Sequence, residues 1–137
     1  MVGRSRTDDM PTTAEDRDAI RDLYARYATD IDAGADRADE WAQHYAADGV
    51  FELGAGQDPL VGRDALRAFA LTMPSTGIRH VLSNLVVDVD GDQARCEALV
   101  IVIMENRIVS VGVARDELAR IDGRWQITRR TFTPDAA

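Results

Sequence analysis

The sequence of 137 residues contains no lysine and only one cysteine, and both features narrow the classes of partner and of chemistry that we expect for the protein. Its 16 cations are all arginine, scattered among 24 acidic residues, and the net charge is −8. Nucleic acids and anionic membranes are bound by clustered cations, so we expect neither kind of partner. Cys96 cannot form an internal disulfide, and it lies in an alternating apolar run. This position predicts a small buried core residue rather than a nucleophile.

Long apolar runs and several familiar site motifs are also missing. No stretch approaches the roughly 18–20 apolar residues of a membrane span, and the first residues contain no apolar leader segment. We therefore expect a soluble, cytoplasmic protein. No cluster of histidine, cysteine and acid has metal-ligand spacing, and no glycine-rich loop connects a strand to a helix. The sequence predicts no metal and no cofactor.

A long first helix is the clearest local prediction. Residues 1–12 are polar and charged and predict a disordered tail, and residues 13–134 predict a single domain. Thr13 and Asp16 resemble a capping box that opens the helix, and Gly34 ends it. The apolar positions between them follow helical spacing: Ile20, Leu23, Tyr24, Tyr27, Ala28 and Ile31.

The remaining elements predict an α+β domain. Two shorter helices are expected over residues 36–46 and 64–71, with short extended segments over 50–53 and 60–63. From residue 78 the apolar residues alternate, which predicts strands over 78–89, 93–104, 108–121 and 124–133. Helices followed by an antiparallel meander favour a curved sheet that packs over the helices and leaves a cavity between them.

One face of the strand over residues 93–104 carries an additional signal. It begins with Arg95 and Glu97 and then turns apolar at Leu99, Ile101 and Ile103. A sheet that is covered on one side stays polar on the other. We expect a second subunit to cover this face, and the alternative is a helix or tail of the same domain.

His80 is the clearest candidate for chemistry. Alternation predicts that Asn84 shares its face of the strand, where the amide could orient a polar group, and that Arg79 points to the opposite face. A lone histidine among apolar residues is often a structural core residue, so this alternative stays open. The second histidine, His44, is interpreted as structural or as part of the rim of a pocket.

Two acids near the end of the first helix are candidate partners for His80. Asp30 and Asp32 flank the apolar stripe on opposite sides, and spacing does not separate them. Arg26 precedes Asp30 by four residues and is its expected surface partner. An acid at a helix C-terminus opposes the helix dipole and suggests a specific role. Tyr24 and Tyr27 lie on the stripe, as core aromatics or as site residues.

The order of these elements resembles the SnoaL-like branch of the NTF2-like superfamily. The resemblance covers residues 14–134 and depends on four short segments: Ile20-Arg-Asp-Leu-Tyr24, Ile31-Asp32, Arg79-His80 through Asn84, and Asp122-Gly123-Arg124-Trp125. It implies a cone-shaped α+β barrel, with three N-terminal helices packed in a curved, mostly antiparallel sheet, and a deep apolar pocket. It also implies a homo-oligomer, dimeric or trimeric.

Family dehydratases and dehydrohalogenases, such as scytalone dehydratase, bile-acid 7α-dehydratase and hexachlorocyclohexane dehydrochlorinase, use an Asp–His pair. The resemblance matches this pair to Asp32 and His80, and a tyrosine five residues before the acid to Tyr27. Some members place a second acid or histidine on the middle strand, where this chain is apolar. The residues expected to contact a small hydrophobic substrate are Tyr24, Trp41, Asn84, Val100 and Val102. The resulting hypothesis is a cofactor-independent lyase or isomerase, and the alternative is a non-catalytic binding or assembly domain.

Overall fold

The computed structural model describes residues 13–54 and 56–136, so the predicted tail over residues 1–12 lies outside the described part. The helical elements are α1 (Thr13–Asp32), the 3-10 helix η2 (Gly34–Arg37), α2 (Ala38–Ala42) and α3 (Arg63–Leu71). The strands are β1 (Tyr45–Glu52), β2 (Leu60–Val61), β3 (Ile78–Asp90), β4 (Gln93–Met104), β5 (Arg107–Ile121) and β6 (Arg124–Pro134). In this part of the chain, no helix has the length and apolar character needed to span a membrane.

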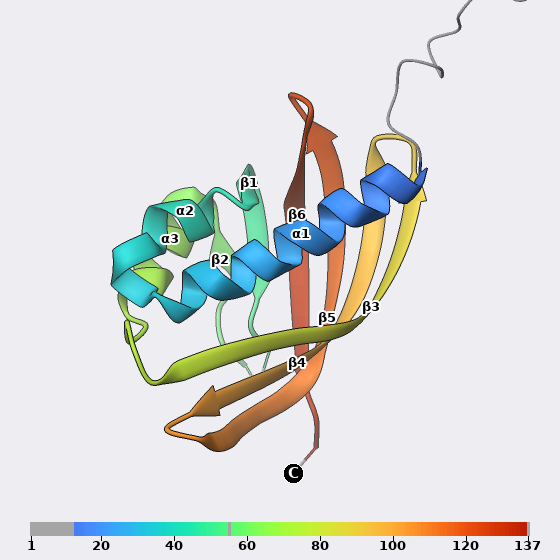
Figure 1. The fold of residues 1–137 in the computed structure, drawn as a ribbon. Coiled ribbons are helices and arrows are strands. Elements are labelled where there is room, and N and C mark those ends of the chain that lie inside the picture. The colour runs from blue at the N-terminus through green and yellow to red at the C-terminus, as the bar shows by residue number, and fades with distance from the viewer. Residues whose placement is uncertain (1–12, 55, 137) are drawn as a thin grey trace, which may run out of the picture.

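The six strands form one mixed sheet in the order β2-β1-β6-β5-β4-β3. Only the β1–β6 pair is parallel, and the other neighbours are antiparallel. The sheet curls strongly at the β3–β5 end, α1 crosses its concave side, and α2 and α3 lie at the other end of that side (Figure 1). The predicted α+β class is therefore confirmed. The sheet is curved but does not close into a barrel, because β2 and β3 remain its two edges.

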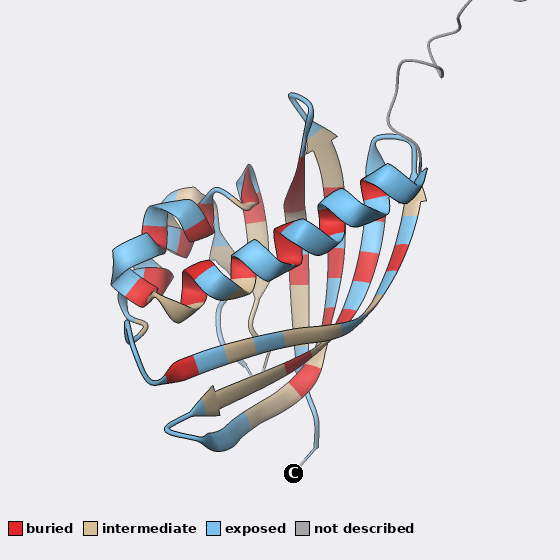
Figure 2. Ribbon diagram, in the orientation of Figure 1, coloured by how far each residue is buried: buried red, intermediate tan, exposed pale blue. Residues whose placement is uncertain are grey.

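The core lies between α1 and the concave side of the sheet. Buried positions recur along α1, and buried and exposed residues alternate along the strands (Figure 2). The stripe predicted for the first helix is buried at Ile20, Leu23, Tyr24, Tyr27 and Ile31. Burying such an apolar stripe is what stabilises an amphipathic helix of this length on a sheet. Cys96 is also buried in this core, as predicted.

The second predicted helix is wrong in its extent. The chain forms η2 and α2, which end at Ala42, and strand β1 already begins at Tyr45. Tyr45 is fully buried and pairs with Ile127 of β6. This pairing joins segments about eighty residues apart in the sequence, so local helical spacing could not predict it.

A β-bulge in β3 overturns the predicted position of Asn84. The register with β4 shifts between Ser83 and Val86, and Asn84 adopts a positive φ of 54°. The extra residue interrupts the alternation, because a bulge opposes two residues of one strand to one of its partner. Asn84 is exposed, and Val87 is the next buried residue of the strand. The prediction that Asn84 shares the face of His80 is therefore wrong.

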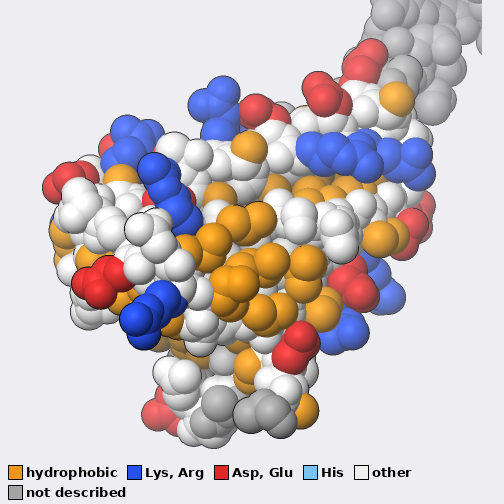
Figure 3. Space-filling model, turned by 60° about the horizontal axis from the view of Figure 1, so that its bottom comes forward, with side chains coloured by type: hydrophobic (Ala, Val, Ile, Leu, Met, Phe, Trp, Pro, Cys, Tyr) orange, Lys and Arg blue, Asp and Glu red, His pale blue; other side chains and the backbone are white. Residues whose placement is uncertain are grey.

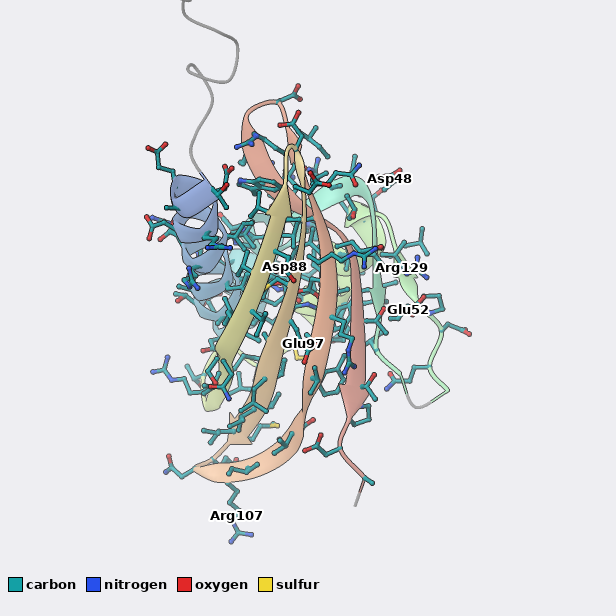
Figure 4. The ribbon with its side chains drawn as sticks, turned by 90° about the vertical axis from the view of Figure 1, so that its right-hand side faces the viewer. Asp48, Glu52, Asp88, Glu97, Arg107 and Arg129 are labelled. Carbon is teal, nitrogen blue, oxygen red and sulfur yellow. The ribbon has the colours of Figure 1, made fainter. Side chains whose placement is uncertain are left out.

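The outer face of the sheet is divided into an apolar half and a charged half. Paired rows of β3, β4 and β5 place Val81 beside Ile101 and Val111, and apolar side chains gather over these strands (Figure 3). Further along the same face, charged residues such as Asp88, Glu97 and Arg129 come from neighbouring strands (Figure 4). The described helices lie on the other side of the sheet, so a second subunit stays the predicted cover of the apolar half.

Candidate active site

A cavity of about 210 Å³ lies between the helices and the curled part of the sheet. Its walls come from α1, α2, α3 and five strands, and they are largely aromatic and aliphatic. The lining residues are Tyr27, Ile31, Trp41, Phe51, Leu53, Gln57, Phe69, His80, Leu82, Val100, Val102, Ser110, Ala114, Arg130 and Phe132. Five of the predicted site residues are therefore in the lining: Tyr27, Trp41, His80, Val100 and Val102.

Asp32 and His80 are in direct contact beside this cavity. Asp32 is the last residue of α1, and His80 is the third residue of β3. The His80 Nδ1 lies 2.8 Å from Oδ1 of Asp32, and the backbone N–H of His80 donates to the same oxygen at 2.7 Å. Both side chains are mostly buried, at 17% and 11% exposure. The end of the helix and the edge strand of the sheet thus meet at one carboxylate oxygen.

This contact determines which nitrogen of His80 carries the proton. A carboxylate can only accept, so the neutral imidazole donates from Nδ1. Nε2 then carries the lone pair, and it has no hydrogen-bond partner among residues 13–54 and 56–136. Because His80 lines the cavity, its unpaired nitrogen is available to a molecule bound there.

Arg79 approaches the same carboxylate from outside. Its Nη1 lies 3.9 Å from Oδ2 of Asp32, and the side chain is 78% exposed. Arg79 does not line the cavity, as alternation predicted. At this distance and exposure the interaction is weak and screened by salt. The carboxylate of Asp32 is therefore bound mainly through the oxygen that faces His80.

Tyr27 also lines the cavity, and its hydroxyl is paired to a second phenol. The hydroxyl oxygens of Tyr27 and Tyr45 are 2.7 Å apart, and both residues are buried. Burial raises the pKa of Tyr27, and the nearby charge of Arg130 partly opposes this rise. Tyr27 therefore stays protonated at neutral pH and can act as a hydrogen-bond donor.

Arg130 and Asp116 form a buried ion pair next to Tyr27. Two nitrogens of Arg130 donate to the two oxygens of Asp116 at 2.9 and 2.7 Å, and the guanidinium carbon lies 4.2 Å from the centre of the Tyr27 ring. Burial is the largest influence on Arg130 and lowers its pKa, but the charge of Asp116, the two phenols of Tyr27 and Tyr45 and the hydrogen bonds to Asp116 together outweigh it, and the pKa lies well above its usual value. Arg130 lines the cavity and is therefore a permanent cation at its wall.

The sequence interpretation missed this pair, although a signal was present. Asp116 and Arg130 occupy inward-facing positions of β5 and β6, and they are paired in register across the two strands. An acid and a base that interrupt an apolar alternation on adjacent strands predict a buried ion pair.

Tyr24 does not line the cavity and is hydrogen bonded to Asp116. Its hydroxyl donates to Asp116, and burial followed by the charge of Asp116 raises its pKa well above the usual value. Tyr24 and the exposed Asn84 lie outside the cavity lining. The structure thus does not bring these two residues to the expected substrate position. Ser110, Gln57 and three phenylalanines line the cavity without having been predicted.

A second Asp–His pair is formed by Asp30, two residues before Asp32 on α1, and His44, which follows α2. Nε2 of His44 is 2.7 Å from Oδ2 of Asp30, and Nε of Arg37 donates to Oδ1 of Asp30 at 2.6 Å. The expected pairing of Asp30 with Arg26 is wrong, because Arg26 pairs with Asp22 instead. Asp30 and His44 line a surface groove and not the cavity.

Within the described residues, no group of three or more histidine, cysteine or acidic side chains could hold a metal ion. The polar groups that the described residues bring to the cavity lining are the imidazole of His80, the phenol of Tyr27 and the paired guanidinium of Arg130, together with the side chains of Ser110, Gln57 and Trp41.

Comparison with solved structures defines the class of protein. An NTF2-like protein with a cystatin-like fold from Novosphingobium aromaticivorans superposes with a TM-score of 0.75 at 26% identity, covering 99% of this chain and 94% of that one. The helices packed in a curved sheet are therefore an NTF2-like fold. The SnoaL-like domain family matches residues 12–131, and the chain belongs to this family.

Two further structures are similar to the chain. Rv3472, a protein of unknown function from Mycobacterium tuberculosis, has a TM-score of 0.79 at 29% identity, covering 89% of this chain and 77% of that one. A candidate aromatic ring hydroxylase from N. aromaticivorans has a TM-score of 0.76 at 27% identity, covering 93% and 94%. No curated protein matches the sequence.

Proposed function

We propose that the protein is a cofactor-independent lyase or isomerase that removes a proton from a small hydrophobic substrate. His80 is the base, Asp32 stabilises its protonated form, and Tyr27 stabilises the negative charge that develops on the substrate. The observation that carries this proposal is the pairing of Nδ1 of His80 with Asp32, which leaves Nε2 without a described partner on the cavity wall.

The proposed first step is a proton transfer. Nε2 takes a proton from a carbon next to a carbonyl group, and the electron pair of the broken C–H bond moves to the carbonyl oxygen, which forms an enolate. Asp32 is then 2.8 Å from an imidazolium and interacts with it through a charge-assisted hydrogen bond. General base catalysis of this kind contributes typically about 10²–10⁴-fold.

The second step returns the proton. In an elimination, the enolate expels a leaving group from the neighbouring carbon, and the imidazolium protonates a departing hydroxide as water. In an isomerisation, the imidazolium returns the proton to a different carbon. Both routes regenerate neutral His80, and neither requires an oxidant, a reductant or a metal.

Tyr27 and Arg130, which also line the cavity, support charge development on oxygen. If Tyr45 donates to the oxygen of Tyr27, then the Tyr27 hydroxyl is free to donate to the enolate, and the distance of 2.7 Å permits that direction. Arg130 places a positive charge against the Tyr27 ring. Donors already fixed where charge develops are the principal source of this kind of stabilisation.

A non-catalytic hydrophobic-ligand-binding domain is the second candidate function. The observation that favours it is the backbone N–H of His80, which also donates to Asp32 and gives that carboxylate a structural role at the junction of α1 and β3. In this alternative, the cavity binds a molecule without transferring a proton.

Exchange of substrate hydrogens in D₂O separates the two candidates. NMR would follow loss of the protons next to the carbonyl of small aromatic ketones, a choice suggested by the aromatic walls and by the name of the hydroxylase neighbour. We expect catalysed exchange that His80→Ala reduces about 10²–10⁴-fold. The control is His44→Ala, which removes the other histidine. Exchange that is equal in native protein and His80→Ala would leave the binding function as the better account.

A further inference from the structure

We propose that Ser110 selects the substrate by hydrogen bonding to an oxygen at the outer end of the bound molecule. This selection, together with the size and charge of the cavity, restricts the substrate to a compact, uncharged ring compound with an oxygen function at each end. The inference rests on the proposed function, because it assumes that the inner oxygen lies near Tyr27.

Ser110 is positioned by the sheet in the same row as His80. Val102 of β4 pairs with His80 on one side and with Ser110 of β5 on the other. Neighbouring strands are about 4.8 Å apart, so the backbones of His80 and Ser110 are separated by roughly 10 Å. A register shift next to this row inserts an extra residue in β5, and all three residues line the cavity. A single ring can therefore lie between the base and the serine.

The hydroxyl of Ser110 has no hydrogen-bond partner among the described residues, and in this it resembles two other groups of the lining, Nε2 of His80 and the buried Nε1 of Trp41. Tyr27 is bound to Tyr45, Arg130 to Asp116, and Nδ1 of His80 to Asp32. A polar group facing apolar walls loses free energy unless it finds a hydrogen bond, so a bound molecule with an oxygen near Ser110 is favoured over one without it.

Burial places Ser110 toward the opening of the cavity. Tyr27 and Arg130 are each only 3% exposed, whereas Ser110 is half-buried and Gln57, in the same lining, is exposed. A molecule whose carbonyl oxygen lies near Tyr27 therefore presents its far end to Ser110. The two ends of the substrate are distinguished by different protein groups.

The cavity volume limits the number of rings. An apolar cavity of about 150 Å³ accommodates benzene. The volume of about 210 Å³ found here exceeds this by the space of a few substituent atoms or a second fused ring. A four-ring compound does not fit into the enclosed space while the walls of Trp41, Phe69 and Phe132 stay in place.

The charges around the cavity favour an uncharged molecule. Among the described residues of the lining, Arg130 is the only permanent cation, and Asp116 neutralises it, while Asp32 adds a further negative charge beside His80. An anionic substrate would enter this site without an unpaired cation to bind it, which carries a large desolvation cost.

Calorimetric binding of two matched ketones tests the role of Ser110. Acetophenone carries one oxygen, and 4-hydroxyacetophenone carries a second at the opposite end of the ring. We expect native protein to bind the hydroxylated ketone about three- to tenfold more tightly, as one neutral hydrogen bond provides. Ser110→Ala removes this preference and changes acetophenone affinity less than about twofold, and Ser110→Thr retains it. The matched control is Ser83→Ala, on the outer face of β3 and outside the lining.

An equal preference for the hydroxylated ketone in native protein and Ser110→Ala would overturn the proposal, and so would the failure of both ketones to bind. Tight binding of a four-ring steroid ketone by native protein would overturn its size limit. The exchange experiment in D₂O tests the proposed proton transfer by His80 separately from the proposed selection by Ser110. A preference that depends on Ser110 without catalysed exchange rejects the proposed chemistry alone, and exchange that depends on His80 without the preference rejects Ser110 alone.

Discussion

Two Asp–His pairs lie at the same end of α1, and the comparison between them shows how identical side chains are placed in different environments. The contacts are nearly the same, at 2.8 Å for Asp32–His80 and 2.7 Å for Asp30–His44. Burial is also similar, because both histidines are less than one fifth exposed. Neither distance nor burial therefore distinguishes the pair to which we assign the proposed chemistry.

The pairs differ in how the carboxylate oxygens are used and in what lies beyond the imidazole. Asp30 offers one oxygen to His44 and the other to Arg37, which links α1 to η2 and to the turn that follows α2. Asp32 accepts both donors of His80 on a single oxygen, and the ring borders the cavity. The first arrangement connects three segments of the chain. The second leaves Nε2 of His80 unpaired among the described residues, in a ring that lines the cavity.

The largest expected effect is the loss of turnover on removing one histidine and not the other. His80→Ala should reduce catalysed proton exchange by about 10²–10⁴-fold, whereas His44→Ala should change it by less than about threefold once folding is checked by circular dichroism. Equal losses in the two variants would mean that the comparison does not separate chemistry from structure.

We expect the stability of the protein to depend more on Asp30 than on Asp32, although activity is expected to depend more on the pair that contains Asp32. Replacing each acid by its amide tests this expectation. The two carboxylate oxygens of Asp30 contact His44 and Arg37, one each. In Asp30→Asn only one of these positions is still an oxygen, so either His44 or Arg37 faces the N–H₂ group instead. A buried donor without an acceptor costs about 1–3 kcal/mol. In Asp32→Asn the single oxygen can still accept both donors of His80. We expect urea denaturation to show a clear loss for Asp30→Asn and a smaller one for Asp32→Asn.

Asp32→Asn also isolates the contribution of charge to the proposed chemistry. The hydrogen bond to Nδ1 is retained and the tautomer is unchanged, so only the stabilisation of the imidazolium is lost. Charged hydrogen bonds exceed neutral ones by about 1–2 kcal/mol, which corresponds to roughly tenfold in rate. Steady-state exchange rates measure this value. A loss as large as that of His80→Ala would indicate that the amide has displaced the ring.

The smallest effect concerns Tyr27, whose ring lies 6.2 Å from that of His44 and whose side chain lines the cavity. Burial raises the pKa of all three tyrosines of the chain, Tyr24, Tyr27 and Tyr45. Their contribution to stability is fully present below the unfolded pKa of about 10 and is lost as pH rises above it. Absorbance at 295 nm should therefore rise together with the loss of circular dichroism. A tyrosine that ionises while the fold is intact would contradict this expectation.

The fold was predictable because its signals are local. The stripe on α1 and the alternation of β4 each determine one element, and β4 has the predicted bounds of Gln93–Met104. The errors occur where a distant partner decides the local structure. Tyr45 lies in a helical pattern but pairs with Ile127, and Asn84 lies in an alternating pattern that a bulge interrupts.

The candidate site was predictable only in part. The resemblance matched the family's Asp–His pair to Asp32 and His80, and the structure places these two residues in contact. The environment of the site was not predictable from spacing, because Ser110 and Arg130 reach the cavity through strand register. Asp116 and Arg130 face one another only once β5 and β6 are aligned.

The hydrogen bond from the backbone N–H of His80 to Asp32 has a consequence for aggregation at high protein concentration. β3 is an edge of the sheet, and edge strands with free backbone N–H groups are sites at which a strand from another molecule can add and begin aggregation. At His80 that N–H is already held by the carboxylate at the end of α1. The side chain of Asp32, which we propose stabilises the protonated form of His80, thus also blocks one position on the edge where a strand from another molecule could attach.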